Sequence, residues 1–138
     1  MTSDQIAAVR HTWAKLTPST ERAAAIFYDR LFELDPRVRA LFAAADLRQQ
    51  GHKFTQTVAI VVDLLDREDE LLAALDTLGR RHAAYGVGWR HYGLAADALF
   101  TALECCLGPA FTAEARAAWS VSYWVAARAM QRAAAQVA

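Results

Sequence analysis

Apolar residues recur at alternating intervals of three and four along most of the 138-residue chain, which is the spacing of one helical face. The stripe is clearest between positions 70 and 85, where it runs through Leu71, Leu75, Leu78, His82 and Tyr85. Because this stripe faces inward, it carries an imidazole into an apolar interior. The pattern predicts a helical protein with one histidine turned toward its core.

Capping motifs separate the predicted helices. Thr2 and Gln5 can form a capping box, and Thr17 and Asp35 each precede a first-turn proline. The pattern predicts helices at about 3–16, 18–33, 36–42, 46–66, 69–84, 90–107 and 112–136. With only 6 glycines and 3 prolines, the composition favours the same all-α fold class. We expect one domain spanning 1–138, because no linker divides the chain.

Charge narrows the range of partners. The 15 basic residues balance the 15 acidic ones, so no broad positive field attracts nucleic acid or an anionic membrane. Charges such as Asp63, Asp97 and Arg128 break each apolar run before roughly 18 residues, so no membrane span is expected. The polar N-terminus does not resemble a signal peptide, and the adjacent Cys105 and Cys106 cannot form an ordinary disulfide. These features favour a reducing, cytoplasmic location.

His82 is the candidate metal ligand, because a neutral imidazole offers one ring nitrogen with a lone pair. The four histidines are scattered and the cysteines lack the two-residue gap of a zinc hook, so structural zinc is not expected. No phosphate-binding loop or Gly-x-Ser-x-Gly motif supports a kinase or hydrolase. A single histidine can hold an iron whose four equatorial positions belong to a porphyrin, which predicts haem.

Two more polar side chains fall on apolar helical faces. Tyr28 is one, either as a core tyrosine bonded to a carbonyl or as a group that meets a ligand. Gln50 is the other, one turn before Phe54. His52 cannot face the same way, because two residues rotate a helix by about 200 degrees. We favour Gln50 as the inward group and His52 as solvated, while a small rotation of the helix start would reverse them.

Two aromatic residues complete the candidate set. Phe42 is either an ordinary core residue or a ring that stacks on a flat ligand. Tyr92 follows His82 by ten residues, so one sharp glycine turn can bring it beside the imidazole. The neighbouring His91 should then point elsewhere.

The chain resembles a globin nearly from end to end. The resemblance rests on the order of Phe27-Tyr28-Asp29-Arg30-Leu31-Phe32, Asp35-Pro36, Leu41-Phe42 and Leu78-Gly79-Arg80-Arg81-His82. In detail it is similar to bacterial single-domain globins related to the haem domain of flavohaemoglobins. Those proteins also have a distal tyrosine and glutamine and a spacing like that from His82 to Tyr92.

The resemblance implies a three-over-three helical sandwich around a b-type haem, iron protoporphyrin IX. It implies that His82 is the proximal iron ligand and that Tyr28 and Gln50 face a bound gas. The implied haem contacts are Phe42, Phe54, Val87 and Tyr92.

The expected function is reversible binding of dioxygen, carbon monoxide and nitric oxide. Nitric oxide dioxygenation would need an external reductase, because the chain ends at Ala138 without a flavin or nicotinamide domain. Ala133-Ala134-Ala135 stands where such globins often place a glutamate that bonds the proximal histidine, so weaker peroxidase-like chemistry is expected. The alternatives are a haem-based gas or redox sensor acting through a partner protein, and a bundle without cofactor. A monomer or weak homodimer is expected.

Overall fold

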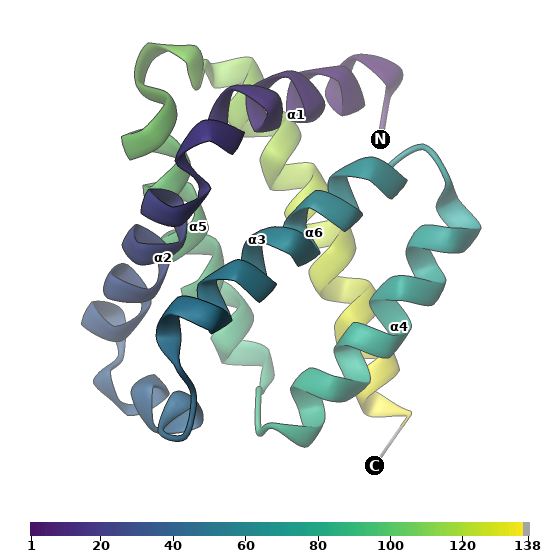
Figure 1. The fold of residues 1–138 in the computed structure, drawn as a ribbon. Helices are drawn as coiled ribbons and strands as arrows, with labels where there is room; N and C mark the ends of the chain where they lie inside the picture. Colours follow the sequence, from purple (N-terminus) through teal and green to yellow (C-terminus); the bar gives the residue numbers. More distant parts are fainter. Residues whose placement is uncertain (137–138) are drawn as a thin grey trace.

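The computed structural model describes residues 1–136 and places most of them in helices (Figure 1). The helices are α1 (Ser3–Leu16), η1 (Thr17–Ser19), α2 (Thr20–Leu34), η2 (Pro36–Phe42), α3 (Leu47–Leu64), α4 (Glu68–Ala84), α5 (Trp89–Leu107), η3 (Gly108–Ala110) and α6 (Ala113–Ala135), where η marks a 3-10 helix. These bounds confirm the predicted helices to within a few residues. The two largest differences are that α2 begins at Thr20 rather than near 18, and that α3 ends at Leu64 rather than near 66.

Side chains cap the helix starts in part as predicted. Thr2 and Gln5 form the expected capping box at the start of α1. The prediction that Thr17 caps the next helix was wrong, because its hydroxyl donates to the Ala14 carbonyl 2.8 Å away. A short 3-10 turn follows, and α2 begins only at Thr20.

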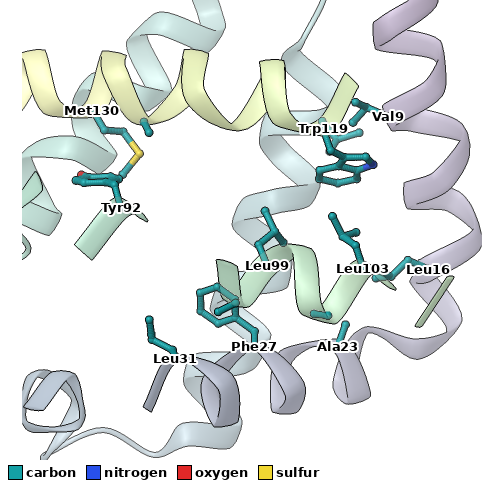
Figure 2. Close-up of a cluster of buried hydrophobic side chains, with 14 of the residues drawn as sticks. Val9, Leu16, Ala23, Phe27, Leu31, Tyr92, Leu99, Leu103, Trp119 and Met130 are labelled. Atoms are coloured by element: carbon teal, nitrogen blue, oxygen red, sulfur yellow. The ribbon is translucent and has the colours of Figure 1, made fainter. Parts of the chain in front are cut away.

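The helices form the predicted three-over-three sandwich, with α1, α3 and α4 in one layer and α2, α5 and α6 in the other (Figure 1). Across the layers α4 packs on α6, α1 packs on α6 and α3 packs on α2, while α2 and α5 pack on each other within their own layer. Figure 2 shows a cluster of buried apolar side chains from α2, α5 and α6, joined by Val9 and Leu16 of α1. The largest fully buried side chains are Leu16, Leu75, Leu103 and Val9.

The crossing of α4 over α6 depends on Gly79. A Cβ at this position would lie 2.4 Å from the Met130 carbonyl oxygen and 2.7 Å from the Met130 Cα. Because those atoms belong to the backbone, any larger residue would push the two helices apart. Gly79 thus sets the position of the helix that carries His82 three residues later.

The helix α5 corrects one expectation from the sequence. Asp97 does not prevent the segment Trp89–Ala110 from being long and apolar enough to cross a membrane by length and composition alone. In the structure this helix packs against α2, and Ala98, Leu99 and Leu103 are buried in the core. Core packing thus accounts for the apolar residues on the buried face of α5, and 28% of the apolar window is buried.

Candidate functional site

Tyr28 lies at the centre of an aromatic cluster between α2, η2 and α3. Its side chain is only 6% exposed. The Phe42 ring stands edge-on to it at 5.4 Å between centroids, and the Phe54 ring does so at 6.1 Å. Phe54 also stacks on Phe27 at 4.1 Å. The structure thus brings Tyr28, Phe42 and Phe54 together, from three segments that are separate in sequence.

Gln50 is the polar neighbour of this tyrosine. Burial raises the pKa of Tyr28, and a hydrogen bond with the Gln50 side chain opposes part of that rise. Gln50 is half-buried, whereas His52 is exposed. His52 instead contributes to the wall of a cavity of about 250 Å³ between α2 and α3. Tyr28 lines the same cavity as His52, so both the glutamine and the histidine lie near the tyrosine, and the choice of Gln50 as the inward group stays a prediction.

His82 is half-buried on α4 with one ring nitrogen engaged. Its Nδ1 lies 2.8 Å from the Leu78 carbonyl oxygen. Since a carbonyl can only accept, Nδ1 carries the proton and donates it, which leaves the lone pair on Nε2. Burial lowers the pKa of His82 and so favours this neutral form. An imidazole in this state is ready to bind a metal through Nε2.

The turn after His82 carries the next two candidates. The Val87 amide donates to the His82 carbonyl at 3.0 Å, and Val87 is half-buried. Tyr92 is 7% exposed and lies beside Met130 (Figure 2). Its carbonyl accepts a hydrogen bond of 2.5 Å from the Tyr123 hydroxyl. These contacts hold both residues against α4 and α6.

Two neighbouring residues point outward. The predicted place of Tyr85 on the inward stripe was wrong: α4 ends at Ala84, so Tyr85 leaves the helical register and is 72% exposed. His91 points away from the core as expected, and its Nδ1 accepts the Gly88 amide at 2.8 Å at the start of α5.

Asp35 forms a structural link that the sequence did not predict. Its carboxylate is 4% exposed and binds the Arg37 side chain at 3.0 and 3.2 Å and the Arg90 side chain at 2.7 Å. The hydrogen bonds from these two arginines hold the pKa of Asp35 well below its usual range, and the larger contribution comes from Arg37. The link to Arg90 ties η2, which carries Phe42, to the start of α5. The Asp35-Pro36 motif predicted only the local cap, because nothing in the sequence marks a partner 55 residues away.

The residues present fit a haem. His82, whose Nδ1 is bonded to Leu78, would supply through Nε2 the one nitrogen that a porphyrin iron takes from the protein on its proximal side. Phe42 and Phe54 supply flat apolar surface, and Tyr28 and Gln50 supply hydrogen-bond donors. Within residues 1–136, no three His, Cys, Asp or Glu side chains gather as a metal site.

Comparison with known proteins finds a family model and relatives that are all globins. A family model described as Globin matches residues 25–130. Neuroglobins of Danio rerio and Tetraodon nigroviridis are 29% and 30% identical over 137 residues, which cover 90% of this chain and 86% of each relative. The predicted kinship with flavohaemoglobin-related globins stays a prediction, since these relatives are neuroglobins.

A solved structure titled as a hexacoordinated heme protein from an anhydrobiotic tardigrade shares the fold with a TM-score of 0.87. It covers 96% of this chain and 94% of its own, at 18% identity. At that identity the likeness concerns the fold alone.

Proposed function

Since the chain belongs to the globin family, we propose that it holds a b-type haem and reversibly binds dioxygen, carbon monoxide and nitric oxide. Haem and gas binding in general follow from membership of the family. The observation that carries the specific proposal is the bond from His82 Nδ1 to the Leu78 carbonyl, which leaves Nε2 free to ligate iron. When bound, the haem supplies an iron atom at which a diatomic gas binds and gains partial negative charge.

The chain's own residues have separate tasks in this proposal. His82 ligates the iron, while Phe42, Phe54, Val87 and Tyr92 contact the porphyrin. The cysteines do not take part, because Cys105 and Cys106 lie on α5 and form no Cys-x-x-Cys-His motif that would attach haem covalently. Noncovalent attachment is the reason for proposing haem b.

Tyr28 and Gln50 donate hydrogen bonds to the gas. The raised pKa of Tyr28 keeps its hydroxyl protonated at neutral pH, so it remains a donor. A hydrogen bond to a charged acceptor contributes roughly 1.5–3 kcal/mol. Dioxygen, which gains more negative charge than carbon monoxide, should therefore be held more strongly by this pair.

The test is an absorption spectrum of the purified protein, reduced and then exposed to dioxygen and to carbon monoxide. The proposal expects haem bands that change reversibly with each gas. A colourless protein that takes up no added haemin would contradict it and leave a helical bundle without cofactor.

Nitric oxide dioxygenation is a second, conditional activity. Dioxygen and nitric oxide would combine to nitrate, and the iron would be left ferric, so an external reductase must return one electron. The support is the Tyr28–Gln50 pair beside the site where the gases meet. Rapid mixing of the oxygenated protein with nitric oxide should give nitrate and ferric protein, and the absence of ferric product would remove this activity.

The proposal also covers the domain organisation, cellular location and oligomeric state of the protein. We propose a single-domain, cytoplasmic protein that acts as a monomer or weak homodimer. The even charge balance and the adjacent cysteines support this setting.

A further inference from the structure

We propose that η2 and the turn between α4 and α5 form a docking surface for an acidic one-electron carrier protein. This inference rests on the proposed haem function, because the carrier would reduce ferric iron. The docking patch, as named here, consists of Leu41, Tyr85, Trp89, Arg37, Arg39 and Arg81.

The patch exposes large apolar side chains on two adjoining segments. Trp89 is 81% exposed, Tyr85 is 72% exposed and Leu41 is 38% exposed. The segments touch, since a Cβ at Gly86 would lie 3.6 Å from Leu41 Cδ2. They lie together along the lower edge of the view in Figure 1. Exposed tryptophan and tyrosine beside arginine are the residues that dominate the energetics of protein interfaces.

The net positive charge of the two segments that form the patch favours an acidic partner. Residues 35–42 and 81–91 contain four arginines and one acidic residue, Asp35, which is buried. Because the whole chain has net charge 0, the rest of it carries the compensating negative excess. Among the described residues, Arg39 and Arg81 form no ion pair within 4 Å, and the Arg37 side chain is 79% exposed. A positive aromatic surface on a protein whose remaining residues are net negative is complementary to an acidic partner.

The position of the patch favours an electron carrier. Arg81 adjoins His82, Leu41 adjoins Phe42, and Trp89 lies two residues from Val87. A partner bound to the patch would therefore contact residues that are sequence neighbours of the candidate haem contacts. In the step we propose, the anionic hydroquinone of a flavin loses one electron to become the semiquinone. Ferric iron gains that electron and becomes ferrous, and no bond forms or breaks at the surface.

The first test measures docking without electron transfer. Oxidised flavodoxin, an acidic flavin protein, is titrated calorimetrically against the haem-loaded ferric protein at low and high salt. Arg39→Glu/Arg81→Glu should weaken binding by at least about tenfold, and high salt should weaken wild-type binding. The matched control Lys15→Glu/Arg22→Glu makes the same charge change on exposed sites in the last turn of α1 and the first turn of α2, and should change binding less than about twofold.

A second variant separates the aromatic contribution from charge. Trp89→Ala should weaken flavodoxin binding by at least about fivefold with unchanged haem uptake, because its ring is exposed rather than packed in the core. Equal affinities for wild type and all variants would overturn the proposal. Binding of the patch to anionic phospholipid vesicles but not to flavodoxin would overturn it too, in favour of a membrane contact.

A third measurement links docking to reduction. The rate at which reduced flavodoxin reduces the ferric protein should fall at least about tenfold in Arg39→Glu/Arg81→Glu. The rate with lumiflavin, a small neutral flavin, should stay the same, which excludes damage at the iron. If wild type binds no haem, the proposed function fails. If wild type binds haem but the variants are reduced by flavodoxin at the wild-type rate, only the docking inference fails.

Discussion

The distal and proximal sides of the candidate site are built in different ways. On the distal side, side chains meet side chains: Phe42 and Phe54 surround Tyr28, and the Gln50 side chain is its polar neighbour. On the proximal side, the backbone sets the arrangement. The Leu78 carbonyl orients the His82 ring, and the bare backbone at Gly79 lies on that of Met130.

The two helix crossings show the same contrast. A Cβ at Gly51 would meet the Ala24 Cβ at 3.1 Å, where a methyl group can yield by a few tenths of an ångström. A Cβ at Gly79 would meet backbone atoms at 2.4 to 2.9 Å, which cannot yield without moving a helix. The crossing of α2 and α3 can therefore accept a small added side chain more easily than the crossing of α4 and α6.

The largest effect is expected from alanine at the proximal glycine. Gly79→Ala should lower the free energy of unfolding by about 1–3 kcal/mol, because α4 and α6 must separate. Gly51→Ala should lower it less. Gly93→Ala is the control, since an added Cβ there meets nothing within 4 Å, and it should stabilise α5 by about 0.5–1 kcal/mol. Urea unfolding of the three variants checks the order, and equal effects at Gly79 and Gly93 would contradict the contrast.

The distal tyrosine should control gas release. Tyr28→Phe should speed dioxygen release by at least about tenfold and carbon monoxide release less, because only the hydroxyl donor is lost. Tyr123→Phe removes a hydroxyl that bonds the Tyr92 carbonyl and should change release by less than about twofold. Stopped-flow displacement of dioxygen measures both. A change below twofold in Tyr28→Phe would show that Tyr28 is not the donor.

The smallest effect is expected on stability, from removing the Asp35 carboxylate that links η2 to the start of α5. The folded-state pKa of Asp35 is depressed, so the folded state binds fewer protons than the unfolded state in acid. Its stabilisation is present above the unfolded pKa of about 3.9 and is lost as pH falls below it. Asp35→Asn should lower stability at pH 7 and flatten the acid loss below about pH 4.

The control for this link is Asp63→Asn, which removes a 74% exposed partner of Arg67. Such surface pairs contribute little, so its stability curve should follow the wild type. Thermal unfolding between about pH 2.5 and 7 compares the two across the acid window. An Asp35→Asn curve that overlays that of Asp63→Asn would show that the buried carboxylate does not stabilise the fold more than a surface pair.

The sequence was sufficient for features that repeat locally. Helix bounds and the inward faces of Tyr28 and Gln50 follow from a 3.6-residue period, which is the same in sequence and structure. The prediction for Tyr85 was wrong because the spacing of apolar residues does not fix the end of a helix to within one residue, and α4 ends at Ala84. The Asp35–Arg90 pair could not be predicted, because it depends on how η2 and α5 meet in space. The roles of the candidate site residues stay predictions.

The central claim is that His82 ligates the haem iron through Nε2, and resonance Raman spectroscopy of the reduced protein tests it most directly. Labelling histidine with ¹⁵N should shift the iron–histidine stretching band in the wild type. His82→Gly should lose that band and regain a similar one, insensitive to labelled protein histidine, when free imidazole is added. An iron–histidine band that persists in His82→Gly and still shifts with labelled histidine would show that another residue holds the iron.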